Sequence, residues 1–270
     1  MEIATPRVPG SRQESMRRFH LFELEDQDWM PIVVRDGVTD YLRTAIQLAD
    51  SYGPMISLLA DALKKSGAER VTDVCAGGGG PWHTLLPALR KKGWNGTVTL
   101  TDRFPNGGAI AQLPAGATYF PEPVDALAVP KELTGFRTLF TAFHHFPPEA
   151  ARAILADAAA KNVPIALFEV TKRSPPYILA MLLSTVTVML LTPAIRPVTW
   201  SRLLFTYIIP LIPLVVTWDG IVSCLRTYTV AELTTMTEEL SDTHIWDVGE
   251  LKGKRILPAT YLIGLPRKSL

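Results

Sequence analysis

The chain has 270 residues, less than twice a typical domain of about 150, which indicates one large domain or one domain with an insertion. Apolar residues make up 47% and charged residues 20%, so the composition excludes a disordered or collagen-like chain. The net charge of +1 gives no overall electrostatic argument for a nucleic-acid partner, and we expect none. Two cysteines are too few for a disulfide framework, and the first 20 residues lack the apolar stretch of a secretory signal. We therefore expect a cytoplasmic protein.

Apolar residues at helical spacing predict two helices near the start, over residues 36–49 and 54–65, after a polar N-terminal arm. From residue 71 the pattern changes to short apolar runs that alternate with helices. We predict strands over residues 71–75, 97–101, 117–120, 137–142 and 164–170, and helices over residues 81–92 and 148–160. Such alternation is typical of a parallel sheet with helices on both faces.

The alternation stops at a strongly apolar block. Residues 177–195 and residues 203–218 contain no charged residue and no histidine. This block accounts for the positive mean hydropathy of +0.17. A polar helix over residues 230–240 follows, and then two strand candidates over residues 245–248 and 260–264.

Together these elements predict an α/β fold: a Rossmann-like, mostly parallel seven-stranded sheet with an N-terminal helical cap and an apolar α-helical insertion between strands 5 and 6. We assign residues 1–53 to the arm and cap, 54–173 and 241–270 to the sheet domain, and 174–240 to the insertion.

The segment Val71-Thr-Asp-Val-Cys-Ala-Gly-Gly-Gly-Gly-Pro-Trp82 joins a strand to a helix through four glycines. Glycine allows positive φ and a close approach of the backbone to a ligand, and a helix start offers unpaired N–H groups. Asp102 ends the next strand, where an acidic side chain can hold a ribose diol. We predict a nucleotide-type cofactor at this edge; a tight turn with a capping aspartate is the alternative.

Two common nucleotide fingerprints do not fit this loop. The dinucleotide pattern G-x-G-x-x-G, started at Gly77, needs glycine or alanine at position 82 and meets Trp82; started two residues earlier, it fails at Cys75. No P-loop Gly-Lys-Ser/Thr occurs. A NAD-dependent reductase and a membrane-associated binding protein without catalysis remain alternatives.

The order acidic-x-small-x-Gly-x-Gly at Asp73, Cys75, Gly77 and Gly79 resembles motif I of the class I S-adenosylmethionine-dependent methyltransferases. Asp102 stands where that family binds the ribose hydroxyls. Val124-Asp125-Ala126 resembles its adenine-contacting segment, and Thr141-Ala-Phe-His-His-Phe146 is similar to the segment that ends its fourth strand. The resemblance covers about residues 55–170 and the closing strand pair.

The resemblance implies S-adenosylmethionine as the cofactor and methyl transfer as the activity. It places Asp73 near the cationic methionine end of the cofactor. Cys75 departs from the family's usual first glycine, which is tolerable if Cys75 keeps β geometry. Trp82 either closes the pocket or packs in the core. The expected cofactor-binding residues are Asp73, Cys75, Ala76, Gly77, Gly79, Asp102, Arg103, Asp125, Ala126 and Ala142.

Methyl transfer from a sulfonium is an in-line displacement of an activated leaving group, so the protein supplies proximity and, for some acceptors, a base. His144 and His145 are the candidate bases, since histidine titrates near neutrality; alternatively one caps the strand end and the other packs under the helix. No third ligand stands at metal-site spacing, so we predict no metal. Tyr41, Glu169 and Asp219 are the predicted substrate residues.

The apolar block has three interpretations. A membrane-spanning helix needs about 20 apolar residues, which only the first run approaches. We predict a lid over a small hydrophobic acceptor, lipid-like or aromatic; a membrane hairpin, peripheral membrane contact and a homodimer interface are the alternatives. The predicted lid buries four apolar residues against the sheet edge, namely Met181, Leu182, Leu211 and Leu214. It leaves two arginines, Arg196 and Arg202, in water.

Overall fold

A seven-stranded sheet of order β3-β2-β1-β4-β5-β7-β6 forms the centre of the computed structural model, which describes residues 16–105, 113–251 and 258–267. The strands are β1 Arg70–Val74, β2 Thr97–Thr101, β3 Ala117–Tyr119, β4 Phe136–Phe140, β5 Ile165–Glu169, β6 His244–Leu251 and β7 Ala259–Pro266. Strands β1 to β5 are parallel, whereas β7 runs antiparallel to both β5 and β6. The predicted fold class is confirmed. The antiparallel β7 distinguishes this sheet from the 3-2-1-4-5-6 order of dinucleotide-binding domains.

Helices cover both faces of the sheet. One face carries α2 (Ile56–Ser66) and α3 (Trp82–Lys91), and the other carries α5 (Pro148–Ala160) and α10 (Val230–Glu238). Side chains alternate along each strand, so that Phe168 of β5 joins the first core and Leu167 the second. We expected α10 within the insertion, but its Leu233 and Met236 pack in the second core, so α10 belongs to the sheet domain.

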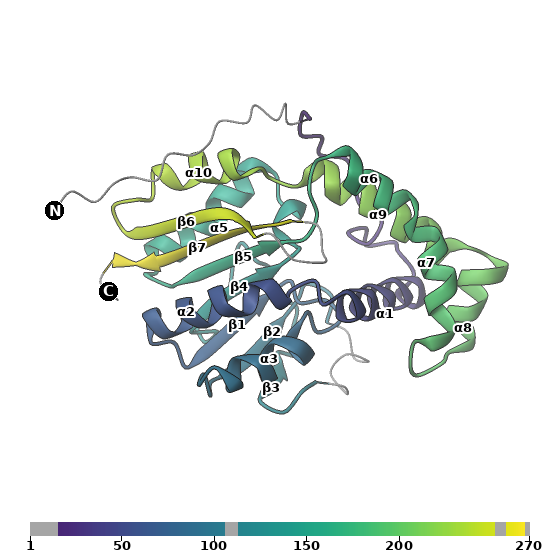
Figure 1. The fold of residues 1–270 in the computed structure, drawn as a ribbon, viewed down its shortest axis with the longest axis horizontal. Coiled ribbons are helices and arrows are strands. Elements are labelled where there is room, and N and C mark those ends of the chain that lie inside the picture. Colours follow the sequence, from purple (N-terminus) through teal and green to yellow (C-terminus); the bar gives the residue numbers. More distant parts are fainter. Residues whose placement is uncertain (1–15, 106–112, 252–257, 268–270) are drawn as a thin grey trace.

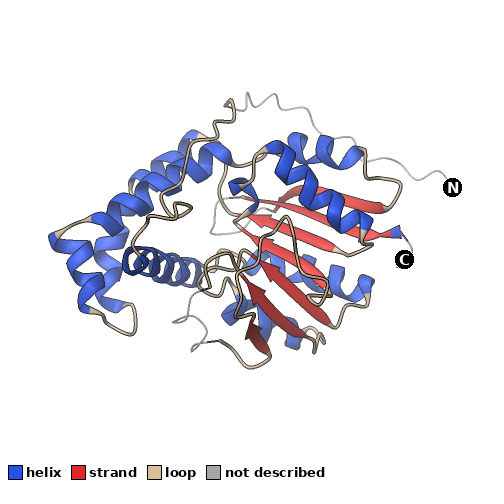
Figure 2. Ribbon diagram, turned by 180° about the vertical axis from the view of Figure 1, so that it is seen from behind, coloured by secondary structure: helices blue, strands red, loops and turns tan. Residues whose placement is uncertain are grey.

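The insertion forms an arm of helices, residues 175–226, that projects from one end of the sheet with α1 beside it (Figure 1). Helix α1 spans Ile32–Ala49, and the arm comprises α6 Pro175–Leu182, α7 Ser184–Leu191, α8 Trp200–Leu203, the π-helical turn η4 Leu204–Ile208 and α9 Leu211–Arg226. Short 3-10 turns lie at η1 Gly53–Met55, η2 Phe143–His145 and η3 Thr192–Ala194. The carboxyl ends of the parallel strands point toward α1 and the base of the arm (Figure 2).

A third apolar core joins the arm to α1. Val34 and Val38 of α1 pack with Val188 of α7 and Ile212 of α9. A Cβ at Gly37 would lie 2.5 Å from Ile212 Cδ1, so glycine at this position lets α9 approach α1 closely. The middle of the arm therefore packs on α1.

The predicted burial of the lid is wrong. Leu182, Leu211 and Leu214 are exposed, because α1 occupies the inner face of the arm and leaves these side chains on the outside. Met181 is half-buried and packs against Gly220 instead of the sheet edge.

The two arginines of the arm differ from each other. Arg196 is exposed, as predicted, whereas Arg202 is buried and not in water. Arg202 Nη1 pairs with Asp40 Oδ2 of α1 at 2.7 Å, and Nη2 donates to the carbonyl of Ile195 at 2.8 Å. A buried ion pair thus ties the arm to α1.

Candidate active site

The glycine loop between β1 and α3 folds tightly. The amide of Ala76 donates to the end of β2 at 2.9 Å, and the amide of Gly79 donates to Ala76 O at 3.0 Å. Gly77 and Gly79 have φ values of 50° and 104°, which side chains with a Cβ rarely adopt. A Cβ at Gly78 would lie only 2.4 Å from Thr39 Cγ2, so glycine lets α1 lie directly on the loop. These loop amides are already engaged, and the loop offers a ligand close backbone approach.

Cys75 stands where motif I has its first glycine, and it does not have the β geometry that would make this departure tolerable. Its φ is 59°, in the left-handed region, which costs a residue other than glycine about 1 kcal/mol or more. Burial, and after it the carboxylate of Asp102, raises the pKa of the thiol well above its ordinary value. Cys75 is therefore an uncharged part of the loop.

Asp102 follows β2 and faces the glycine loop. Its Oδ2 accepts from the Gly77 amide at 2.7 Å, and its Oδ1 accepts from the Phe104 amide at 2.8 Å. Burial raises the pKa of this carboxyl above its ordinary value, against the effect of the two amides. A carboxylate has about four acceptor positions, so two remain for the hydroxyls of a ribose. The residue predicted to hold the ribose therefore has the right chemistry at the right edge.

The remaining predicted adenine-side residues divide into two groups. The segment 124–126 lies beside Asp102, since the Val124 amide donates to Asp102 O at 2.8 Å, with Ala126 buried and Asp125 exposed. Arg103 is corrected: its exposed guanidinium lies on the surface, 3.7 Å from Asp28.

Asp73 is also corrected, because its carboxylate is used inside the protein. Oδ2 accepts from Trp82 Nε1 at 2.7 Å, and Oδ1 accepts from the Thr138 hydroxyl at 2.6 Å. Burial raises the pKa of Asp73 to about 7. Trp82 is fully buried, so of its two interpretations the structure selects the core. This aspartate fixes the start of α3 against the sheet and is not directed at a cofactor.

The two histidines stand on a tight turn after β4. Thr141 has a φ of 49°, and η2 follows directly. The buried Ala142, a predicted cofactor neighbour, accepts from the His145 amide at 3.2 Å. The turn brings both rings to the carboxyl edge of the sheet, with centroids 4.4 Å apart.

Glu169 ends the neighbouring strand β5 and positions His144. Its Oε2 lies 2.8 Å from His144 Nδ1, while Oε1 accepts from the amides of Phe143 at 2.7 Å and His144 at 3.2 Å. Burial would raise the pKa of Glu169, but the His144 ring, and after it His145 and the Phe143 amide, together outweigh burial, and the pKa is lowered. Glu169 is thus an ionised carboxylate that fixes the ring of a buried histidine, where we had predicted a substrate contact.

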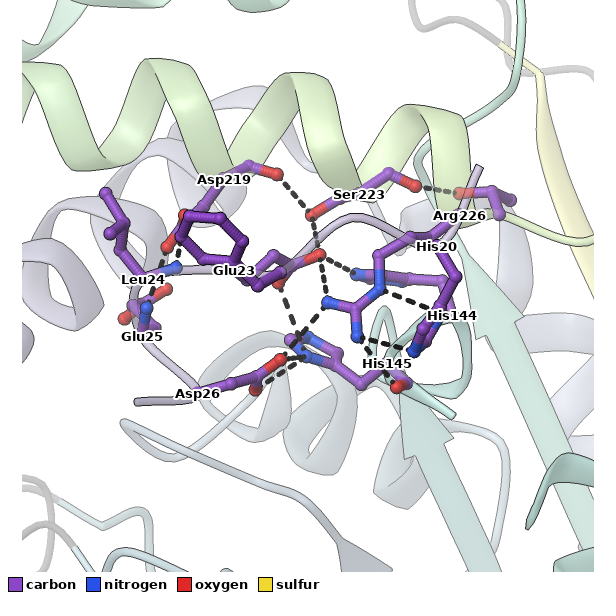
Figure 3. A network of polar contacts seen from close by, with 12 residues as sticks. His20, Glu23, Leu24, Glu25, Asp26, His144, His145, Asp219, Ser223 and Arg226 are labelled. Atoms are coloured by element: carbon purple, nitrogen blue, oxygen red, sulfur yellow. Dashed lines mark hydrogen bonds and ion pairs between the residues drawn. The ribbon is translucent and has the colours of Figure 1, made fainter. Parts of the chain in front are cut away.

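Two acidic residues of the N-terminal segment face the histidines (Figure 3). His145 Nδ1 lies 2.9 Å from Asp26 Oδ1 and 3.3 Å from Glu23 Oε2, and His144 Nε2 lies 3.6 Å from Glu23 Oε1. Burial would lower the pKa of His145, but Glu23 and then Asp26 raise it to about 10. His145 is therefore an imidazolium at neutral pH in this conformation.

Arg226, at the end of α9, joins the N-terminal segment to the histidine turn. Its Nη1 lies 3.1 Å from both Glu23 Oε1 and Asp26 Oδ2, and its Nη2 donates to His145 O at 2.9 Å. Arg18 donates to the carbonyls of Phe146 at 3.1 Å and Arg226 at 2.6 Å. The cluster balances buried carboxylates with arginines and an imidazolium.

Two predicted substrate residues have structural partners instead. Asp219 lies inside α9 and accepts from the amides of Leu24 at 2.7 Å and Glu25 at 3.0 Å, so it fastens the N-terminal segment to the arm. Burial raises its pKa to about 7. Tyr41 is buried between α1 and the arm, with its hydroxyl 2.6 Å from the Thr187 hydroxyl.

The structure supplies the third potential metal ligand that the sequence did not show. Ligand atoms of Glu23, His144 and His145 all lie within 4.8 Å of one another. However, His145 is already paired with Asp26, and the guanidinium of Arg226 contacts Glu23. A divalent cation would have to displace a proton from His145 and lie beside the guanidinium of Arg226. Hydrogen bonds and ion pairs therefore fit these side chains better than a metal ion does.

Sequence analysis missed Glu23, Asp26 and Arg18. They lie in the N-terminal segment, more than a hundred residues from the histidines they contact. For the two acidic residues, the only feature in the sequence is an acidic run, Glu23-Leu-Glu-Asp26, between apolar residues. Nothing in that run specifies its partner.

No protein-family profile matches the chain, and no curated protein sequence is similar to it. Among solved structures it is similar to the plantazolicin methyltransferase BpumL in complex with a pentazolic desmethylPZN analog and SAH. That match has a TM-score of 0.50 and 10% identity, over 90% of this chain and 97% of that one.

Two further structures match less closely. They are an O-methyltransferase family protein from Burkholderia thailandensis, at TM-score 0.48 and 15% identity, and human N-acetylserotonin methyltransferase in complex with SAM, at 0.45 and 11%. These matches cover 84% and 81% of this chain but only 59% and 53% of those proteins. The chain has the class I methyltransferase fold, and at such identities the likeness is one of fold.

Proposed function

We propose that the protein is an S-adenosylmethionine-dependent methyltransferase that methylates a protonated oxygen or nitrogen of a small hydrophobic acceptor, with His144 as the general base. The observation that carries this proposal is the buried pair of Glu169 and His144, which stands at the same sheet edge as the glycine loop and Asp102. A fold of this class puts cofactor and acceptor at that edge.

The pair has the geometry of a positioned base. Glu169 lies 2.8 Å from His144 Nδ1, so a proton held there leaves Nε2 as the acceptor of a second proton. The ionised Glu169 also stabilises the imidazolium that forms when Nε2 takes the acceptor's proton. Such positioned bases contribute about a hundredfold to ten-thousandfold to a rate.

The residues present fit the cofactor. Asp102 would hold the ribose hydroxyls, Gly77 would allow the backbone to lie close to the sugar, and residues 124–126 would border the base. When bound, S-adenosylmethionine supplies a methyl group activated by its positive sulfur. The complex with SAH named above supports this choice over a nicotinamide cofactor.

Glu23 covers the base in the conformation described. Its Oε1 faces His144 Nε2 at 3.6 Å, in the direction from which an acceptor would deliver its proton. The N-terminal segment must therefore withdraw Glu23 for the acceptor to reach His144. Next to this segment, Phe22 and Trp218 form an aromatic pair with centroids 5.8 Å apart, and both are partly exposed. An apolar acceptor fits these surroundings.

The test is binding of S-adenosylhomocysteine by calorimetry to the wild type and to Asp102→Ala. A charge-assisted hydrogen bond contributes about 1.5–3 kcal/mol, so the variant should bind at least about tenfold more weakly. Asp61→Ala, an exposed aspartate on α2, is the matched control and should bind normally. Binding of NADH in place of S-adenosylhomocysteine would contradict the proposal.

A further inference from the structure

The arm presents stripes of exposed apolar side chains on its outer face. On α6 and α7, Leu179, Leu183, Val186 and Leu190 recur every three or four residues, and each is more than half exposed, up to 72% for Leu190. This spacing places them on one side of the helices. Such an extended apolar surface marks an interaction site in a folded protein.

The second stripe lies on α9, which runs antiparallel to α6 and α7. Thr185 lies 2.6 Å from Thr217, and Met181 packs on Gly220, which fixes this pairing. Leu211, Leu214 and Trp218 of α9 are exposed, as are Ile208 at 74% and Trp200 at 87% in the preceding segment. Residues Pro175–Ala194 are apolar and long enough to cross a bilayer, with 22% of that window buried, and the bent segments Trp200–Ile208 and Leu211–Arg226 pass the same test together.

The inner face of the arm is already covered. Val188 and Ile212 pack on α1, and Arg202 pairs with Asp40 there. A hairpin crossing a bilayer would bring this helix, with its Arg35, Asp36, Asp40 and Arg43, into the hydrocarbon, which is costly for charged groups. Only the outer face is available, so the arm can lie in a membrane surface but cannot cross it as folded.

Several polar side chains of the arm are satisfied within it. Ser184 donates to Met181 O at 2.6 Å, Thr192 donates to Val188 O at 2.8 Å, and the Tyr207 hydroxyl donates to Met189 O. Lipid requires this, because hydrocarbon offers no hydrogen-bond partner. A typical interface between protein chains instead carries about ten hydrogen bonds, for which this face has few donors to offer.

The charges of residues 175–218 also favour a lipid surface as the partner. Residues 175–218 contain no aspartate, glutamate or lysine, and their two charged residues are Arg196 and Arg202. Arg202 is used on Asp40, whereas Arg196 is exposed at the turn between the two apolar runs. Exposed Trp200 adds an aromatic side chain of the kind that favours the interface between water and lipid.

From these observations we propose that the outer face of the arm binds the surface of an anionic lipid bilayer, lying in its plane with α1 and the sheet domain outside. The apolar stripes enter the boundary between headgroups and acyl chains, and Arg196 meets the anionic headgroups. This proposal does not depend on the proposed methyl transfer, since it concerns a surface that is separate from the histidine cluster.

The experiment is flotation of the full chain with vesicles of phosphatidylcholine and phosphatidylglycerol. The wild type should float with the vesicles. Leu190→Glu and Leu214→Glu should each partition about tenfold or more weakly, since each variant loses an exposed leucine that the bilayer would bury and gains a charge. Ile245→Glu, at an exposed apolar position on the edge strand β6, is the matched control and should float as the wild type does. Equal unfolding temperatures show that the variants are folded.

Three outcomes would overturn the proposal. Failure of the wild type to float excludes bilayer binding. A wild-type dimer in solution that Leu190→Glu converts to a monomer, without flotation of either, assigns the face to a second copy of the chain. Resistance of the bound protein to alkaline carbonate extraction shows a spanning hairpin instead of surface binding, for which carbonate should release the protein.

Discussion

The sheet domain and the arm are both strongly apolar, yet the sheet domain buries its apolar side chains and the arm exposes many of them. In the sheet domain, Phe140 stacks on Phe168 at 5.3 Å and meets the edge of Trp82 at 5.7 Å, and all three are buried. In the arm, Leu190 and Ile208 are largely exposed. The sheet has helices on both faces, whereas the arm has α1 on one face only. Hydropathy therefore indicates how much apolar surface a segment carries, and the number of packing partners decides whether that surface is buried or exposed.

The N-terminal segment joins these two regions at the point where the chemistry is expected. Asp219 of the arm binds the amides of Leu24 and Glu25, while Glu23 faces the histidines of the sheet domain. The histidine cluster is thus built at the junction, and it draws its charges from both sides.

The largest expected effect tests whether methyl transfer depends on a histidine of the sheet domain. We expect His144→Gln to lower kcat by about a thousandfold, because the acceptor's proton then has no base. The measurement is transfer of a labelled methyl group. His244→Gln replaces another buried histidine, on β6, whose Nε2 lies 3.1 Å from Val163 O, and it should retain kcat. Equal activity of His144→Gln and wild type would remove the base from the mechanism.

The next effect tests how firmly the arm is tied to the rest of the protein. Asp40→Ala leaves the buried Arg202 guanidinium without its carboxylate, and we expect a loss of about 3 kcal/mol in the free energy of unfolding. Urea denaturation measures it, and limited proteolysis should show earlier cleavage in the arm. Asp40 also pairs with Arg43 at 2.9 Å, so the double variant Asp40→Ala/Arg202→Met separates the two contacts.

The double variant removes the Arg202 charge, so the share of the lost stability that belongs to the Arg202 contact should return, and the remaining loss reports the contact with Arg43. An arm that folds independently of α1 would instead leave the single variant as stable as the wild type. That result would also weaken the argument that α1 keeps the arm from crossing a bilayer.

The sheet could be predicted from sequence because its signals are local. Alternating short apolar runs and helices identified β1 to β5 within two residues of their ends, and the glycine run located the loop beside Asp102. These features depend on neighbours along the chain and on strand order. The helices of the arm were also visible as apolar runs.

Partners distant in sequence could not be predicted. Asp73 matches motif I, but its carboxylate is taken by Trp82 and Thr138, which no spacing reveals. Glu23 reaches the histidines because Asp219 and Arg226, some two hundred residues later, hold its segment in place. Side-chain direction in a packed structure depends on such contacts, and the residue pattern leaves it open.

The smallest expected effect concerns the junction itself and depends on pH. Because the pKa of His145 is raised from 6.5 to about 10 in the folded protein, its protonation stabilises the fold fully below pH 6.5, and this contribution is lost as the pH rises toward 10. Asp26→Asn removes one of the two carboxylates that raise the pKa. Between pH 6.5 and about 9.5, the free energy of unfolding should therefore fall less in the variant than in the wild type, by about 1 kcal/mol.

Chemical denaturation at a series of pH values measures this difference. Asp28→Asn, two residues away on the same segment but highly exposed and 3.7 Å from a surface arginine, is the matched control and should follow the wild-type curve. Because Glu23 remains beside His145 in Asp26→Asn, the dependence should be reduced and not abolished. Parallel curves for Asp26→Asn and wild type would mean that His145 is neutral in the folded protein, and His145 would then rejoin His144 as a candidate base.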